Sequence, residues 1–246
     1  MKKILCLFGA LTLLLTSCSS DDSSSDSSDN VLLKKMVVTN SDGEKYTTNY
    51  KYDGNKIVSA IDDTGDANLY YTYTGDLITK IEFKYPDGTI DQINTFSYNA
   101  EGKLTTFVRV EPNMDWGHKE VYTYNTDGTI SVTSYSGDSE TQTGEGVTST
   151  IKFVNGEVSE ILAITANQPD HKYTYDNKNN PTKNILGMDK IAFVDGEGNG
   201  VKFNILTDTA DGDLWGNSTF TYNDQGYPTK EVNTGSDSVG TTEYFY

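Results

Sequence analysis

One short pattern recurs along most of the chain: an aromatic residue, any residue, a second aromatic, then Asp or Asn and a turn that contains Gly. Alternate residues of a β-strand face the same way, so each aromatic pair projects from one face of a strand. Asn or Asp opens a tight turn, and Gly takes its left-handed position. This pattern, which we call the signature, therefore predicts a β-hairpin at each copy. The copies begin at Tyr50, Tyr71, Phe96, Tyr122, Ile151, Tyr173 and Phe220, and the chain ends on a further aromatic pair, Tyr244 and Tyr246.

The spacing of the copies predicts how many strands the chain forms. The second aromatic recurs every 21 to 29 residues, except for one step of 47 between Tyr175 and Tyr222. A unit of about 24 residues holds two strands and two turns, so we expect an all-β antiparallel meander of roughly 14–18 strands. The wide step predicts a degenerate copy near Ile191-Ala192-Phe193. Residues 179–189 look least like a strand and predict a loop or a short turn of helix.

A meander of this length must protect its two edge strands. It can close into an up-and-down barrel or remain a long curved single-layer sheet. Strand-forming residues at both ends, 31–39 and 244–246, favour pairing of the first and last strands and therefore a closed barrel. Both faces of the expected strands carry polar groups, as with Lys103 and Arg109 opposite Thr106. A lipid-facing strand needs an uninterrupted apolar outer face, so we expect a soluble barrel.

The signature resembles the repeat of a family of Bacteroidota lipoproteins of unknown function that have a porin-like fold. The resemblance covers most of residues 44–246 and rests on the Tyr-x-Tyr-Asp/Asn-x-x-Gly units. The units are also similar to the tyrosine–aspartate repeats of Rhs-type shell proteins, which are far longer and whose toxin-enclosing role does not carry over. The family resemblance implies a β-barrel-like fold and supplies no activity and no catalytic residues.

The N-terminus has the features of a lipoprotein leader. A basic start is followed by an apolar run over residues 4–15, which is shorter than the about 20 residues that a transmembrane helix needs. The run ends in Leu15-Thr16-Ser17-Cys18, which resembles the bacterial lipobox. In a lipobox the Cys thiol takes the diacylglyceryl group and the chain is cut just before it. We therefore expect residues 1–17 to be a signal peptide and Cys18 to be lipidated and to anchor the protein to a membrane.

Residues 18–30 are expected to form a tether. They contain no apolar side chain after Cys18, so they cannot join a core, and as a flexible coil they reach roughly 20 Å. Residues 31–246 then form the repeat-built β domain. Ser19 stands where Asp would retain a lipoprotein in the inner membrane, and Asp21-Asp22 resembles the surface-export signal of Bacteroidota lipoproteins. We expect the outer membrane and the cell exterior; a periplasm-facing anchor is the alternative.

Charge and cysteine content exclude several classes of function. The net charge is −17, and loss of the leader's two Lys lowers it by two more. Such a charge argues against nucleic acid as a partner and against direct adhesion to anionic membranes. Cys6 leaves with the leader and Cys18 is lipidated, so the mature domain has neither a disulfide nor a thiol for catalysis. The 17 Tyr must supply much of the buried area.

The candidate binding residues gather away from the signature turns. Those turns lie at one end of the sheet, and the longer, irregular connections lie at the other, which we call the variable end. Trp116, His118, His171 and Trp215 all map to the variable end, where loops on a rigid scaffold commonly carry binding. The two Trp, with Asn113 and Asp115 nearby, can be read as a platform for sugar rings or as plugs of the barrel mouth. The two His are either a metal pair or strand-end residues.

Catalytic and metal motifs are weak. Asp195, Glu197 and Asn199 resemble the start of a calcium loop, but the position where such a loop carries Glu is Leu206, and turn chemistry also explains these residues. Gly137-Asp138-Ser139 resembles the serine block of one esterase group without its strand-to-helix context. The sequence contains no Gly-x-Ser-x-Gly, phosphate loop or zinc signature. We expect a protein that is not an enzyme and that needs no cofactor or metal.

Taken together, the residues predict a non-catalytic surface lipoprotein that binds an extracellular ligand, such as a glycan or a protein, at its variable end. Two alternatives remain open. One is a carrier that holds an apolar ligand inside a Tyr-lined barrel, and the other is a structural protein of the envelope.

Overall fold

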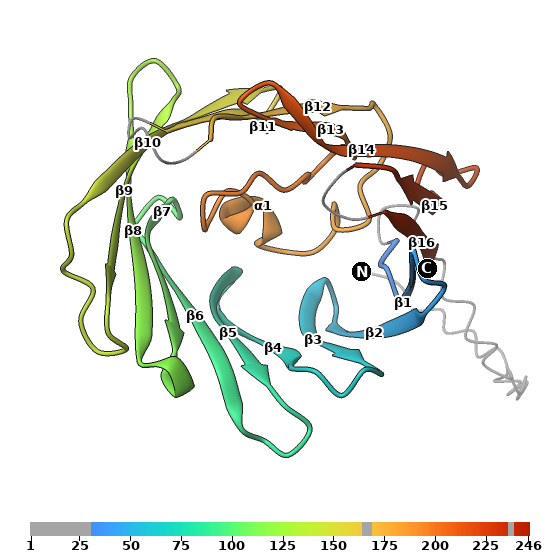
Figure 1. Ribbon diagram of the computed structural model, residues 1–246, viewed down its shortest axis with the longest axis horizontal. Helices are drawn as coiled ribbons and strands as arrows, with labels where there is room; N and C mark the ends of the chain where they lie inside the picture. The colour runs from blue at the N-terminus through green and yellow to red at the C-terminus, as the bar shows by residue number, and fades with distance from the viewer. Residues whose placement is uncertain (1–30, 164–168, 236–238) are drawn as a thin grey trace, which may run out of the picture.

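The structure, a computed structural model, describes residues 31–163, 169–235 and 239–246. It is a closed barrel of sixteen antiparallel strands, each paired with its neighbours in chain order (Figure 1). β1 (Lys35–Asn40) pairs with β16 (Gly240–Phe245) and closes the ring. The predicted all-β, closed up-and-down barrel is confirmed, and the long open sheet is excluded. The predicted leader, Cys18 and the tether lie outside the described residues.

The other strands follow the hairpin pattern, with a signature turn after each even-numbered strand up to β10 and after β14. Gly54 and Gly128 in these turns have φ of 56° and 87°, which an L side chain rarely adopts. The remaining strands are β2 (Lys45–Asp53), β3 (Lys56–Asp62), β4 (Asn68–Thr74), β5 (Leu77–Lys84), β6 (Ile90–Tyr98), β7 (Leu104–Glu111), β8 (Trp116–Tyr124), β9 (Ile130–Gly137), β10 (Val147–Val154), β11 (Glu157–Ala163), β12 (His171–Tyr175), β13 (Ile205–Ala210), β14 (Asp213–Tyr222) and β15 (Pro228–Asn233). A 3₁₀ turn, η1 (Pro112–Met114), and one helix, α1 (Met188–Ile191), complete the described elements.

In three copies the second aromatic of the signature ties its strand to the preceding one. Tyr98 donates its hydroxyl to the carbonyl of Ile78 at 2.7 Å, and Tyr175 donates to Val158 at 2.7 Å. Tyr246 makes the same bond to Pro228 at 3.0 Å. The three acceptor residues are among the most deeply buried of the barrel. The repeated Tyr therefore supplies both buried area and a hydrogen bond between successive hairpins.

The residue between the two aromatics faces outward. It is exposed in all eight copies: it is Lys, Thr or Ser in the seven internal copies and Phe245 in the terminal pair, and the internal ones are Lys51, Thr72, Ser97, Thr123, Lys152, Thr174 and Thr221. A membrane-inserted barrel presents an apolar outer band instead. The outer wall is therefore polar at the level of the signature, except at Phe245 on β16. Within the described ranges, no helix is long and apolar enough to cross a membrane.

Residues 176–204, which link β12 to β13, fold back into the lumen (Figure 1). We call this segment the plug. The expected repeat copy near Ile191-Ala192-Phe193 is wrong, because these residues end α1 and continue the plug rather than form a strand. They look strand-like because they are buried: Phe193 meets Tyr122 and Phe153 edge-on at 5.5 and 5.8 Å. The loop or short helix expected over residues 179–189 is confirmed.

The base of the plug is bonded to the wall at the signature end. Glu157 on β11 is 2% exposed, and its carboxylate accepts the backbone N–H groups of Val201, Lys202 and Phe203 at 3.0, 2.6 and 3.1 Å. Tyr73 donates its hydroxyl to Leu186 at 3.1 Å. These bonds hold the plug on the β5–β12 side, where its apolar residues join the main core. The opposite side of the lumen is left partly open.

Candidate ligand-binding site

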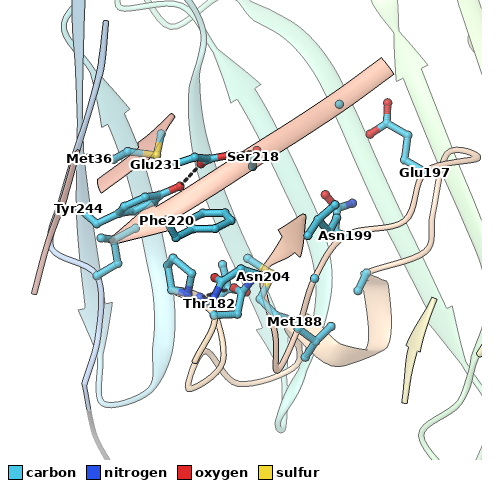
Figure 2. A pocket seen from close by; sticks show the side chains of 18 of the residues that line it. Met36, Thr182, Met188, Glu197, Asn199, Asn204, Ser218, Phe220, Glu231 and Tyr244 are labelled. Atoms are coloured by element: carbon cyan, nitrogen blue, oxygen red, sulfur yellow. Dashed lines mark hydrogen bonds between the residues drawn. The ribbon is translucent and has the colours of Figure 1, made fainter. Parts of the chain in front are cut away.

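Several cavities lie between the plug and the barrel wall, and two of them are relevant to ligand binding. The larger one, about 960 Å³, lies between the plug and a wall that includes Met36 on β1, Leu69 on β4, Phe220 on β14 and Tyr244 on β16. Figure 2 shows this lumen cavity, with Tyr244, Glu231 and Phe220 from the wall and Thr182, Met188 and Asn204 from the plug. Sequence reasoning missed it, because a cavity inside the barrel depends on where the plug lies. The feature of the sequence that relates to this cavity is the step of 47 residues between Tyr175 and Tyr222, which contains the plug.

The smaller cavity, about 540 Å³, lies at the variable end and is called here the mouth cavity. It brings together residues that the sequence analysis selected on separate grounds: His118, His171, Trp215, Asp195 and Glu197. Trp116, Asn113, Asp115 and Asn199 do not line it. The other lining residues are Glu120, Ser134, Ser149, Ile161, Ala163, Pro169, Tyr173, Gly196, Gly198, Ile205 and Asp208.

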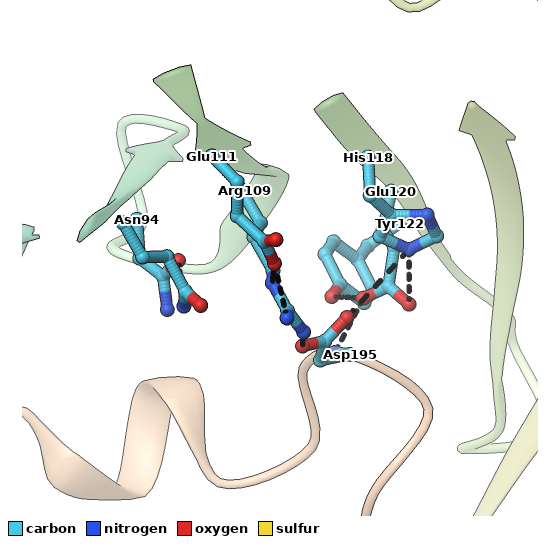
Figure 3. Close-up of polar contacts among 8 residues, drawn as sticks. Asn94, Arg109, Glu111, His118, Glu120, Tyr122 and Asp195 are labelled. Carbon is cyan, nitrogen blue, oxygen red and sulfur yellow. Dashed lines mark hydrogen bonds and ion pairs between the residues drawn. The ribbon is translucent and has the colours of Figure 1, made fainter. Parts of the chain in front are cut away.

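A polar network fixes the tip of the plug to the wall beside this cavity (Figure 3). Glu120 is 3% exposed, and its Oε2 accepts the backbone N–H of Asp195 at 2.9 Å and the hydroxyl of Tyr122. Its Oε1 lies 3.3 Å from Nε2 of His118. Burial, followed by the charge of Glu120, raises the pKa of Tyr122 well above its usual value. Glu120, which sequence reasoning did not single out, is thus the centre of the network.

Arg109 extends this network and packs on Trp116. Its Nη1 donates to Oδ2 of Asp195 at 2.8 Å, and its Nε donates to Oε1 of Glu111 at 3.0 Å. The guanidinium lies 5.3 Å from the centre of the Trp116 ring, and that ring stacks parallel to His118 at 6.1 Å. Trp116 therefore packs behind the mouth cavity, against Arg109 and His118.

Asn113 and Asp115 tie loops together at the variable end. Asn113 Nδ2 donates to the carbonyl of Ile90 at 3.1 Å. Asp115 Oδ1 accepts the backbone N–H and the hydroxyl of Ser139 at 3.2 and 2.7 Å. Asp115 also adopts a left-handed conformation, with φ of 46°. Both side chains therefore make hydrogen bonds that connect segments at the variable end.

The opposite wall of the mouth cavity is aromatic. Trp215 is 38% exposed and meets the ring of His171 edge-on at 5.6 Å. Nδ1 of His171 lies 3.0 Å from Oδ1 of Asp208, which fixes the orientation of the ring. Tyr173 stacks on His171 at 6.0 Å and accepts the backbone N–H of Gly198 at 3.1 Å, and burial raises the pKa of Tyr173 to about 12. Its hydroxyl proton has no acceptor within the described part of the chain.

Glu197 projects from the plug where the two cavities meet, since it lines both. Its carboxylate makes no hydrogen bond or ion pair with residues 31–163, 169–235 or 239–246. Burial, followed by the charge of Asp195, raises the pKa of Glu197. The side chain is therefore free to meet a ligand from either cavity.

The resemblance of Asp195, Glu197 and Asn199 to the start of a calcium loop is not matched by a cluster of ligands in the described residues. In the ranges that the structure covers, no group of three or more His, Cys, Asp or Glu side chains is placed to hold a metal ion. The physical reason at Asp195 is that its carboxylate is already paired with Arg109. His118 and His171 are each directed to a carboxylate of their own, Glu120 and Asp208.

The chain has the porin-like barrel fold. Its backbone superposes on the crystal structure of a porin-like protein from Bacteroides vulgatus ATCC 8482 with a TM-score of 0.55, at 14% identity, over 88% of this chain and 98% of that one. A porin-like protein from Bacteroides uniformis ATCC 8492 matches with a TM-score of 0.50, at 12% identity, over 87% and 97% of the two chains. Neither a known protein family nor a curated protein matches the sequence. At these identities the likeness concerns the fold.

Proposed function

We propose that this protein is a lipid-anchored envelope protein that binds an extracellular glycan, without catalysis, in the mouth cavity. The observation that carries the proposal is the convergence of Trp215, His171 and Asp208 on one cavity at the variable end. The mouth cavity thus combines an exposed aromatic face with oriented polar groups.

The chemistry of the mouth cavity suits a sugar. A pyranose ring has an apolar face that packs on an indole, and Trp215 offers one at the cavity edge. Sugar hydroxyls both donate and accept hydrogen bonds, and the cavity holds the acceptors Asp208 and Glu197 together with the free hydroxyl proton of Tyr173. A few oriented polar groups on an apolar wall are what small-ligand sites commonly share.

The expected absence of catalysis remains part of the proposal. The most buried carboxylate of the site, Glu120, is engaged by Asp195 N–H, by Tyr122 and by His118. Asp208 is engaged by His171. We therefore assign these groups to shaping the cavity and to binding.

The geometry of the barrel fits anchoring at Cys18. The chain enters β1 at the signature end, where Lys34 donates its backbone N–H to Phe245 and Val31 accepts a hydrogen bond from Asn184 of the plug. A tether attached at that end would leave the mouth cavity at the far end of the barrel, facing away from the membrane. On a surface-displayed protein, that end would meet extracellular glycans; on a periplasm-facing protein, it would meet envelope glycans.

A glycan array probed with residues 31–246, which contain all sixteen strands, tests the proposal. We expect binding to a defined set of glycans, and we expect Trp215→Ala to weaken it by about tenfold or more because the stacking surface is lost. Leu214→Ala removes the exposed neighbour of Trp215 and serves as the control. Binding that survives Trp215→Ala unchanged, or an array without a hit, would contradict the proposal.

A further inference from the structure

The lumen cavity is adjacent to the mouth cavity, and the two share the lining residues Glu197, Asp208 and Ile205. With about 960 Å³ it is the larger of the two, and it is near the upper end of the roughly 300–1,000 Å³ that small-molecule pockets occupy. It is therefore large enough for a ligand of its own.

Most of its wall is apolar or aromatic. Six large apolar or aromatic side chains line this cavity: Met36, Leu69, Tyr71, Met188, Phe220 and Tyr244. Packing against them removes apolar surface from water, which stabilises a complex by about 25 cal/mol for each Å² buried. Burial of apolar surface in this cavity would therefore stabilise the binding of a small apolar group.

One deeply buried polar group facing this cavity has spare hydrogen-bonding capacity. Asn204 is 2% exposed, and its Nδ2 donates to Oδ2 of Asp176 at 2.9 Å and to the carbonyl of Asn179 at 3.3 Å. Its Oδ1 accepts no hydrogen bond from any described residue. Every side-chain N or O atom that is fully shielded from solvent in the described chain does have a partner. Oδ1 must therefore remain accessible from the cavity that Asn204 lines, and it awaits a donor.

The charge of the cavity selects among ligands. Its described lining contains the carboxylates of Glu197, Asp208 and Glu231, and none of the described lining residues is Lys, Arg or His. Glu231 accepts hydrogen bonds from Ser218 and Tyr244, each at 2.5 Å, which holds its charge in place. An anionic head group would be repelled by these carboxylates, with no cation in the lining to compensate. A neutral head group avoids this repulsion, and a cationic one is attracted to the carboxylates.

We propose that the lumen cavity binds a neutral or cationic amphiphile, with its apolar body against Leu69, Tyr71 and Phe220 and its donor head group on Oδ1 of Asn204. This is a second ligand site, and it does not depend on glycan binding at the mouth cavity. On this proposal a free fatty acid is not the preferred ligand.

Isothermal titration calorimetry with decylamine, decanol and decanoate tests this site, because the three probes share one alkyl chain and differ in head-group charge. Residues 31–246 are used, since they hold every strand of the closed barrel. We expect decylamine and decanol to bind at least about tenfold more tightly than decanoate. Equal affinity for all three probes, tighter binding of decanoate, or no binding of any probe would overturn the proposal.

A matched pair of variants places the probe in the cavity. Leu69→Trp fills the lumen side of β4, and Thr72→Trp adds the same side chain to its exposed outer face. We expect Leu69→Trp to weaken decylamine binding by about tenfold or more and Thr72→Trp to leave it unchanged. Circular dichroism melting confirms that both variants fold, and glycan binding should persist in Leu69→Trp. Loss of binding in both variants, or in neither, would contradict the assignment.

Discussion

At the scale of single residues, the signature Tyr explains why so few aliphatic side chains suffice for a barrel of this size. Several of the second Tyr residues pack the ring inside the barrel and donate to a backbone carbonyl of the preceding strand, as Tyr98 does to Ile78, whereas Tyr222 donates to Asp176 of the plug. Where the repeat carries Phe153 instead, no hydroxyl is present, and the ring packs edge-on against Phe193 of the plug. At these two positions, Tyr occurs where its hydroxyl reaches a carbonyl, and Phe occurs where the ring packs on another ring.

Replacing Tyr98 by Phe should destabilise the barrel by about 1–2 kcal/mol, because the carbonyl of Ile78 then loses its partner in a buried place. Denaturant unfolding followed by circular dichroism measures the change. Tyr70→Phe is the matched control, since the Tyr70 ring is exposed on the outer wall. Equal stability of the two variants would show that the hydrogen bond from Tyr98 to Ile78 contributes nothing to the stability of the barrel.

The sequence predicted at which end of the barrel the candidate residues lie, but it did not predict which residues they contact. The alternation of strands placed Trp116, His118, His171 and Trp215 correctly at the variable end, because turn order is a local property. It did not identify Glu120 as the centre of the network. The bond from Asp195 to Glu120 spans 75 residues, and the bond from Arg109 to Asp195 spans 86. Contacts across such separations leave no periodic trace in the sequence.

At the scale of elements, the plug is the part of the fold that local patterns could not predict. The hairpins were predictable because each copy carries its own turn chemistry. Ile191-Ala192-Phe193 has the same apolar character whether it pairs in a sheet or packs against the inner wall. The distinguishing fact is where the backbone hydrogen bonds go, and for the plug base they go to a side chain, Glu157.

Replacing Glu157 by Gln should loosen the plug, because the amide group cannot accept all three backbone N–H groups as the carboxylate does. We expect a loss of about 1.5–3 kcal/mol in the free energy of unfolding and faster amide exchange at Val201, Lys202 and Phe203. Hydrogen exchange followed by mass spectrometry provides the measurement.

Glu160→Gln provides the control for this change. Glu160 lies on the same strand, but it bonds at the surface to Lys152 at 2.8 Å, and surface pairs of this kind contribute about 0–1 kcal/mol. If both Gln variants exchange at the wild-type rate over residues 201–203, Glu157 does not anchor the plug.

At the scale of the whole molecule, the buried Tyr residues make stability depend on alkaline pH. Burial raises the pKa of Tyr50 and of Tyr173 to about 12, from 10.0 in the unfolded chain. Below pH 10 both states keep the phenol protons and this contribution to stability is complete. As the pH rises from about 10 towards 12, the unfolded chain releases its protons first, so the free energy of unfolding falls.

Denaturant titrations at stepped alkaline pH, with phenolate absorbance as a second signal, check this dependence. Exposed rings such as Tyr70 ionise while the barrel is folded, and the remaining phenolate should form together with loss of the β-sheet signal, because the buried rings ionise when the barrel opens. A stability that stays constant over this range, or ionisation of every Tyr while the sheet is intact, would contradict the burial of these rings.

The central claim is that the lumen of a plugged, porin-like barrel receives the ligand, and thiol labelling tests it directly. Residues 31–246 contain no Cys, so a single one can be introduced without background. Ser149→Cys lies in the mouth cavity, and Thr148→Cys lies on the other face of the same strand. A saturating glycan chosen from the array should slow labelling of Ser149→Cys by roughly tenfold and leave Thr148→Cys unaffected. Labelling of Ser149→Cys that is as fast with the glycan as without it would show that the ligand does not bind inside the barrel.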